Sequence, residues 1–174
     1  MATLTLLHPS PSEPIADGPG ITAHLQSMGL DYQQWEPGHP LGDDATPEEI
    51  LAAYEKDLAP LKAKGGYTTA DVVDLKPDTP NLDTLLNKFN KEHWHAEDEV
   101  RFTLAGWGIF FINPKNGPVA KIEVTAGDLL VVPQGTLHWF ELGDDRRIRA
   151  IRLFQDPVGW TPHYTKSGAE QLYL

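Results

Sequence analysis

The sequence contains no cysteine, which excludes disulfides, zinc–thiolate sites and cysteine nucleophiles. It has no early apolar stretch with the basic start of a signal peptide, and no apolar run that approaches the length of a membrane span. Basic residues are scarce, 14 against 25 acidic ones, which gives a net charge of −11. Because nucleic acids and anionic membranes are bound through basic patches, we expect neither as a partner. Because signal-peptide and membrane-span patterns are lacking, we expect a soluble protein of the cytoplasm.

The length of 174 residues predicts a single domain, 1–174, with one sizeable core. Within it we expect a helical N-terminal portion over residues 20–90, a metal-binding barrel core over 91–156 and a C-terminal tail, 157–174, that shows no assignable pattern. Fifteen glycines and fifteen prolines indicate many turns, as an antiparallel β fold needs. There is no internal repeat and no low-complexity tract.

The clearest helix start is Thr46-Pro47-Glu48-Glu49. Thr46 can cap the helix, Pro47 suits its first position and Glu49 completes a capping box. Apolar residues then recur at helical spacing as far as Gly65-Gly66, with Pro60 as a possible kink or end. A second helix is predicted from Asp78-Thr79-Pro80, with an apolar face that packs on the barrel. The other elements expected before residue 90 are a strand at Thr3–Leu6, a loop at Pro9–Gly20, a helix at Ile21–Met28, and strands at Tyr32–Trp35 and Val72–Leu75.

After residue 93 the pattern becomes that of β strands separated by turns. The predicted strands are Val100–Leu104, Gly108–Asn113, Val119–Val124, Asp128–Val132, Leu137–Leu142 and Arg147–Phe154. A hairpin turn is expected at residues 114–118. This pattern predicts a mainly β protein with some helix (α+β), arranged as a closed barrel or jelly roll.

Histidines and a carboxylate occur at metal-ligand spacing in two segments. His93 and His95 are two residues apart, so in a strand they face the same way, and Glu99 lies at even spacing from both. His138 follows an apolar run and a turn signal, Pro133-x-Gly135. Three imidazoles and one carboxylate suit divalent iron, nickel, cobalt, manganese or zinc. The alternative is that these are unrelated surface or core residues.

The two segments resemble the two cupin motifs. The first reads His93-x-His95-x-x-x-Glu99 followed by Gly106, and the second runs from Gly127 through Pro133-x-Gly135 to His138. Two positions depart from the usual pattern: Asn87 replaces a glycine and Leu142 replaces an asparagine. Neither is a metal ligand in the motif. The resemblance implies a cupin-type jelly-roll barrel with a few packed helices.

The likeness to the acireductone dioxygenase family is closer still. It is carried by Glu92–Phe102, Pro133–Phe140, Ala150–Phe154 and Asp156–Trp160, and it covers nearly the whole chain. It implies an oxidoreductase of methionine salvage that uses dioxygen and binds one Fe²⁺ or Ni²⁺ per chain through His93, His95, Glu99 and His138. The implied substrate is the acireductone 1,2-dihydroxy-3-keto-5-methylthiopentene. With Fe²⁺ the family forms a 2-keto acid and formate; with Ni²⁺ it forms methylthiopropionate, formate and carbon monoxide.

Strand parity turns Arg101 toward the predicted site, because it lies two residues after Glu99. A buried guanidinium there can stabilise a substrate dianion, or it can merely orient the carboxylate of Glu97 or Glu99. Asp98 and Glu92 flank the ligands. Each is a candidate hydrogen-bond partner of a metal-binding histidine, or else a solvated charge.

Two aromatic residues are candidates for a pocket around the methylthio group, namely Phe140 and Trp160, with core packing as the alternative for both. Arg152 is expected to form a structural ion pair. We expect a monomer whose ligands are a small molecule and dioxygen. Two other classes stay open: another metal-dependent cupin dioxygenase with a different small enediol or diketone substrate, and a non-enzymatic metal-binding cupin.

Overall fold

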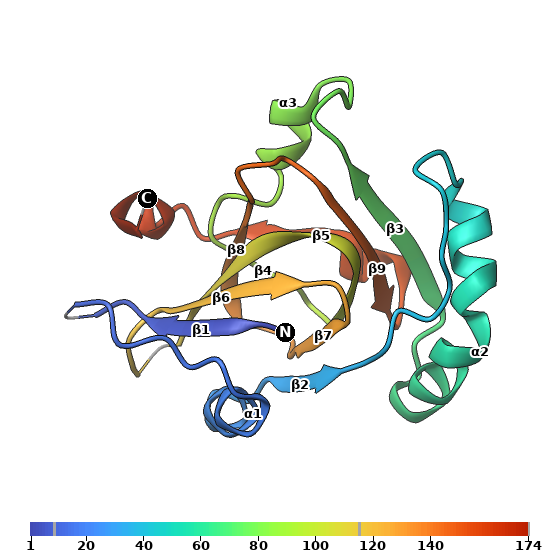
Figure 1. Cartoon of the computed structure of the whole chain (residues 1–174). Coiled ribbons are helices and arrows are strands. Elements are labelled where there is room, and N and C mark those ends of the chain that lie inside the picture. The colour runs from blue at the N-terminus through green and yellow to red at the C-terminus, as the bar shows by residue number, and fades with distance from the viewer. Residues whose placement is uncertain (9, 115, 174) are drawn as a thin grey trace.

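Two β sheets that share one long strand form the body of the protein in this computed structural model, which describes residues 1–8, 10–114 and 116–173 (Figure 1). The shared strand is β5 (Glu99–Asn113). The first sheet runs in the order β1 (Thr3–Leu6), β6 (Ala120–Thr125), β5, β8 (Leu137–Leu142), β4 (His93–Trp94) and β10 (His163–Tyr164). The second sheet contains β2 (Asp31–Gln34), β7 (Asp128–Val132), β5, β9 (Ile148–Phe154) and β3 (Thr69–Leu75). The predicted mainly β, cupin-type barrel fold is confirmed.

Strand β5 corrects the prediction of separate strands at Val100–Leu104 and Gly108–Asn113. Its first half pairs with β7 and β9, and its second half with β6 and β8. The pairing with β9 is irregular between Thr103 and Ala105, and Gly106 follows with φ of +71°. A side chain at Gly106 would meet the carbonyl oxygen of Arg147 at 2.0 Å. The chain therefore bends at a glycine and continues, instead of ending one strand and starting another.

Helix α2 (Pro47–Gly65) begins as the sequence predicts. Thr46 Oγ1 accepts from the backbone N–H of Glu49, and the Glu49 carboxylate accepts from that of Thr46. Pro60 lies inside the helix, which ends one turn later where Gly66 adopts the left-handed conformation. The helix lies beside β3 in Figure 1, and its buried residues pack with Phe102, Ile151 and Leu153 of the second sheet.

The two other helices differ from their predicted bounds. Helix α1 (Gly18–Ser27) starts inside the loop predicted at Pro9–Gly20, because the Asp17 carboxylate accepts from the backbone N–H of Gly20 at 2.7 Å and caps it. Helix α3 (Leu82–Leu86) starts after the predicted Asp78-Thr79-Pro80. The Thr79 hydroxyl accepts from the backbone N–H of Lys76, so it closes a turn and does not cap a helix.

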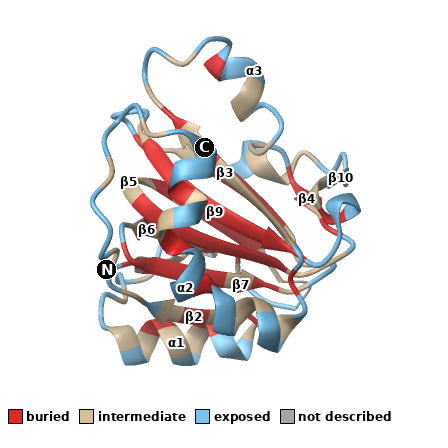
Figure 2. Ribbon diagram, turned by 90° about the vertical axis from the view of Figure 1, so that its right-hand side faces the viewer, coloured by how far each residue is buried: buried red, intermediate tan, exposed pale blue. Residues whose placement is uncertain are grey.

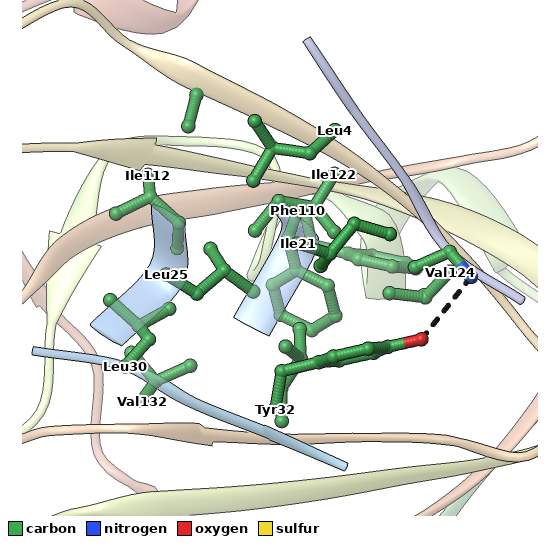
Figure 3. Packing of buried hydrophobic residues seen from close by; sticks show 14 of the residues in the cluster. Leu4, Ile21, Leu25, Leu30, Tyr32, Phe110, Ile112, Ile122, Val124 and Val132 are labelled. Carbon is green, nitrogen blue, oxygen red and sulfur yellow. Dashed lines mark hydrogen bonds between the residues drawn. The ribbon is translucent and has the colours of Figure 1, made fainter. Parts of the chain in front are cut away.

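Buried residues are concentrated on the strands, while the outer faces of the helices are exposed (Figure 2). One apolar cluster fills the space between α1 and the strands, where Ile21 and Leu25 pack with Leu4, Phe110 and Ile122 (Figure 3). Residues 157–173, which the sequence left without a pattern, form two 3₁₀ turns, η1 (Pro157–Trp160) and η2 (Ala169–Tyr173), on either side of β10. Pro9 of the predicted loop, Lys115 of the predicted hairpin turn and Leu174 lie outside the described residues. Among the described residues, no helix is long and apolar enough to cross a membrane.

Candidate metal centre

Three buried histidines converge at one end of the barrel. His93 on β4 lies directly opposite His138 on β8, and His95 follows β4. Each of the three offers a ring nitrogen within 4.8 Å of the others. Strand β4 ends at Trp94, so His95 is not held by the strand ladder; its carbonyl accepts from the backbone N–H of Gly135 at 3.0 Å instead. The two motifs that are separate in the sequence therefore form one site.

The ring contacts of two histidines leave a nitrogen lone pair facing the site. Nδ1 of His93 lies 2.6 Å from the carbonyl of Lys91, and Nδ1 of His138 lies 2.8 Å from the carbonyl of Thr136. A carbonyl only accepts, so Nδ1 carries the hydrogen and Nε2 is the free acceptor, as metal binding requires. Burial, reinforced by His138, lowers the pKa of His93 from 6.5 to about 3, so this ring stays neutral.

Glu99 completes a mixed donor set. Its carboxylate is 1% exposed, and Oε1 accepts from Nε and Nη2 of Arg101 at 3.1 and 2.9 Å. The other oxygen, Oε2, lies 3.3 Å from Nε2 of His95 and 3.5 Å from Nε2 of His138. Among the described residues, no donor forms a hydrogen bond with Oε2. Burial alone raises the pKa of Glu99, but Arg101 and the histidines hold it well below its usual range.

A divalent cation fits this arrangement. A buried carboxylate oxygen without a hydrogen bond is destabilised, and an ion between Oε2 and the imidazoles would satisfy it. The ring nitrogens of His93, His95 and His138 are close enough together to hold a metal ion, which supports the predicted metal-binding site. Glu99 as the fourth ligand stays a prediction, to which the position of Oε2 adds support.

Arg101 is the ion-pair partner of the Glu99 carboxylate. It is 4% exposed, and its guanidinium lies over the rings of Phe110 and Phe140, at 5.1 and 5.5 Å from their centroids. The sequence left two roles open for Arg101, and its ion pair with Glu99 matches the one in which it orients a carboxylate. Direct action on the substrate stays a prediction.

Asp98 and Glu92 contact groups other than the histidines. Asp98 Oδ1 accepts from the backbone N–H of Gln134 at 2.8 Å, which ties the loop after His95 to the turn before His138. Glu92 accepts hydrogen bonds from three side chains of β5 and the C-terminal segment. The expectation that one of these carboxylates accepts a ring N–H does not hold for His93 or His138, whose Nδ1 partners are backbone carbonyls.

A cavity of about 480 Å³ opens beside the histidines. Its lining residues are Leu85, Lys88, Phe89, His93, His95, Arg152, Trp160, Pro162 and Tyr164. Trp160 lines it as predicted, with an indole N–H that has no partner among the described residues. Phe140 does not line the cavity. It is 2% exposed and packs in the core, where the Arg101 guanidinium lies over its ring.

Five of the other lining residues were not identified from the sequence as pocket residues, namely Leu85, Lys88, Phe89, Pro162 and Tyr164. Leu85 and Phe89 belong to a predicted apolar helix face that was assigned to packing, and Pro162 and Tyr164 lie in the tail that has no periodicity. Arg152 forms the expected ion pair, with Nε 2.8 Å from the Asp71 carboxylate. Arg152 also lines the cavity, and its guanidinium lies over the Phe89 ring, 5.7 Å from the ring centroid.

A cupin-type β barrel with a buried cluster of three histidines defines the protein as a metal-binding cupin. The chain belongs to the ARD/ARD' family, whose model matches residues 39–162. It is 43% identical over 169 residues to the acireductone dioxygenase of Picosynechococcus sp., which covers 97% of this chain and 96% of that protein. It is 44% identical over 149 residues to the acireductone dioxygenase of Parvibaculum lavamentivorans, 86% of this chain and 80% of that one.

The solved structure of acireductone dioxygenase from Bacillus anthracis, which holds a cadmium ion in its active centre, is similar throughout. The TM-score is 0.86 and the identity 38%, over 94% of this chain and 98% of that one. The predicted family is therefore confirmed, and with it the prediction of an enzyme of the metal-dependent dioxygenase class.

Proposed function

We propose that the protein is an acireductone dioxygenase of methionine salvage, which oxidises 1,2-dihydroxy-3-keto-5-methylthiopentene with dioxygen. The observation that carries this proposal is the convergence of three buried histidines with an unpartnered carboxylate oxygen, in a chain 43% identical to a protein of that name. With Fe²⁺ bound we expect 4-methylthio-2-oxobutanoate and formate as products, and with Ni²⁺ bound 3-methylthiopropionate, formate and carbon monoxide. We further propose that the protein acts as a monomer in the cytoplasm.

We assign one ion per chain to Nε2 of His93, His95 and His138 and to Oε2 of Glu99. When bound, the ion supplies a Lewis acid that orients an enediolate and stabilises its negative charge. Arg101 occupies Oε1 of Glu99 with two hydrogen bonds, so the carboxylate is fixed with Oε2 directed to the histidines. The backbone carbonyls of Lys91 and Thr136 hold two of the rings in the same way. The chain thus holds its donors in place before the ion arrives.

The cavity suits a small anion with an apolar side chain. Its volume of about 480 Å³ lies within the usual range for ligand pockets. Four apolar residues are among its lining residues, namely Leu85, Phe89, Trp160 and Pro162, and they can exclude water from a methylthio group. Arg152 adds a positive charge at the wall.

The test is product analysis of the metal-free protein after reloading with Fe²⁺, with a desthio acireductone analogue and dioxygen. Keto acid and formate formed only by the reloaded protein support the proposal, and reloading with Ni²⁺ should then add carbon monoxide. A matched control is His39→Ala, which removes an exposed histidine that pairs with Asp57 far from the cavity lining. No turnover above the metal-free level, with iron shown to be bound, would favour another small enediol or diketone as substrate, or a binding protein.

A further inference from the structure

One wall of the cavity comes from residues 160–164, which follow the last long strand. Trp160, Pro162 and Tyr164 all face the cavity, and the Tyr164 ring centroid is 6.0 Å from that of His93. Within the strand β10, this wall has little anchoring through its side chains beyond the stacking of the His163 ring on Trp94, with ring centroids 4.3 Å apart. Strand β10 has two residues, both exposed, and its ladder partner β4 is equally short. Something other than core packing must keep the wall against the histidines.

Glu92 supplies the attachment. It directly precedes His93 and is 2% exposed. Its Oε1 accepts from the hydroxyls of Thr165 and Ser167, both at 2.7 Å, and its Oε2 accepts from Nδ2 of Asn113 at 2.6 Å. Its backbone joins the same contact: the Glu92 carbonyl accepts from the N–H of Thr165, and its N–H donates to the Glu170 carboxylate.

The contact between Glu92 and residues 165–167 joins a charged acceptor to uncharged donors. The donors that meet the buried Glu92 carboxylate are neutral groups, two hydroxyls and one amide. Hydrogen bonds to an ionised acceptor are about twice as strong as those between neutral groups. A buried charge also needs all of these donors at once, so losing the segment would leave it unsatisfied. The contact therefore favours one position of residues 165–167 over any other.

We propose that Glu92 is a positioning residue for the substrate cavity: its carboxylate fastens residues 165–167 to β4 and thereby holds Tyr164 and Pro162 as a wall beside His93. The residue acts through the wall and does not touch the metal or the substrate. Loosening this contact should weaken substrate binding while the metal stays bound. The effect on substrate rests on the proposed function, whereas the fastening itself does not.

The test compares Glu92→Gln with wild-type protein, both loaded with Ni²⁺. The glutamine keeps the size but removes the charge and places an amide donor among the three donors. Two readouts follow the wall directly: hydrogen exchange of the Thr165 amide, and trypsin cleavage after Lys166, which lies between the two fastened residues. We expect both to become faster by about tenfold or more, with the nickel content unchanged. In turnover with the desthio analogue, KM should rise about tenfold with kcat within about threefold of wild type.

Two further sets of variants keep the proposal falsifiable. Thr165→Val with Ser167→Ala removes the donors from the other side, and combining this pair with Glu92→Gln should add little, because both changes break the same contact. Glu123→Gln is the matched control, since Glu123 pairs with Lys121 on the exposed side of β6. It should leave exchange, cleavage and KM unchanged.

Unchanged exchange and cleavage in Glu92→Gln would overturn the fastening. Faster exchange with an unchanged KM would overturn the positioning role, and loss of nickel would show that Glu92 acts on the ligand geometry instead. If the wild-type protein does not turn over the analogue at all, the proposed function fails, yet the exchange and cleavage results still decide the fastening.

Discussion

The metal centre and the wall of the cavity beside it are built in different ways. The metal centre, called the floor below, combines Glu99 and Arg101 of β5 and His138 of β8, all less than 5% exposed, with two residues that line the cavity, His93 of β4 and His95. The wall is made of the five-residue helix α3, the turn η1 and the two-residue strand β10. Two of the four proposed ion donors, Glu99 and His138, thus lie on long, heavily paired strands, while the residues proposed to select the substrate lie on short elements.

The difference follows from the number of partners that each element has. Strand β5 pairs with four strands, and Glu99 at its start pairs with Val132 of β7. Strand β10 pairs only with β4 among the described strands, and its other contacts are the stacking of His163 on Trp94 and side-chain hydrogen bonds of the residues around it. A rigid donor set favours tight metal binding, and a loosely anchored wall can change without loss of the fold. Variants of the floor should therefore affect metal and stability, and variants of the wall should affect KM.

The largest effect is expected from His138→Ala on the floor. Removing one imidazole should lower metal affinity by more than about 100-fold, because changes to outer partners of ligands alone cost 10- to 100-fold. Titration with Ni²⁺ measures the affinity, and loss of turnover should follow the loss of metal. Wild-type affinity in this variant would remove the histidine from the ligand set.

The second-largest effect is expected from Arg101→Met, also on the floor. It leaves the Glu99 carboxylate buried without its partner, which costs about 3–5 kcal/mol of unfolding free energy. Urea unfolding of the metal-free protein measures this change, and Arg101→Lys, which keeps the charge, should lose less. A loss below about 1 kcal/mol for the methionine variant would mean that the ion pair adds little to the rigidity of the floor.

Acid should weaken the metal-free protein through His93. In the folded chain its pKa lies at about 3, but in the unfolded chain it returns to 6.5, so below pH 6.5 the unfolded state binds the proton first. The contribution of this group is complete above pH 6.5 and falls by about 1.4 kcal/mol per pH unit as the pH is lowered toward 3. Urea unfolding between pH 7 and pH 5 measures the slope. His93→Gln should reduce it, and an unchanged slope would assign the acid sensitivity to other groups.

Trp160→Ala tests the wall. Removing the indole opens the apolar side of the cavity, and we expect KM for the desthio analogue to rise about tenfold with nickel content and unfolding free energy nearly unchanged. Steady-state kinetics on the nickel-loaded protein separates the two constants. A fall in metal content would show that the wall and the floor are not independent.

The smallest effect is expected from Tyr164→Phe. The tyrosine hydroxyl donates to the carbonyl of Lys88 at 2.9 Å, and this exposed hydrogen bond is worth about 1 kcal/mol or less. Thermal unfolding should change little, while amide exchange near residue 164 should become slightly faster. A large loss of stability would mean that the wall contributes to the global fold.

The sequence predicted the floor better than the wall for a physical reason. The spacing of His93, His95 and Glu99 predicted that the three lie together, although β4 ends at Trp94 and His95 is held by a loop contact with Gly135 instead of by strand pairing. The pairing of β4 with β8 then brings His138 into the same site. Strand alternation also placed Phe140 on the same face as His138, and from this Phe140 was expected to line the pocket. Alternation gives the face of a residue but not its depth in the core, and Phe140 is buried against the Arg101 guanidinium.

Apart from Trp160, the wall was not predicted, because its order comes from contacts between distant residues. Nothing within residues 157–173 forms a periodic pattern, and the segment is held by Glu92 and Asn113 from elsewhere in the chain. Helix α3 shows the same limit at a smaller scale. Asp78-Thr79-Pro80 is typical of a helix start. The Thr79 hydroxyl instead accepts a hydrogen bond from the backbone N–H of Lys76 and closes a turn, and the helix begins only at Leu82.

The register of β4 with both β8 and β10 has a consequence for how the protein is made. His93 faces His138 on one side, and Tyr164 on the other. During synthesis, the ligand set cannot be complete until residue 138 has left the ribosome, and the wall cannot close until residue 164 has. Contacts between such distant positions form late, because the loop between them must close first. In a nascent chain, the pairing of His93 with His138 therefore becomes possible before the pairing of His93 with Tyr164.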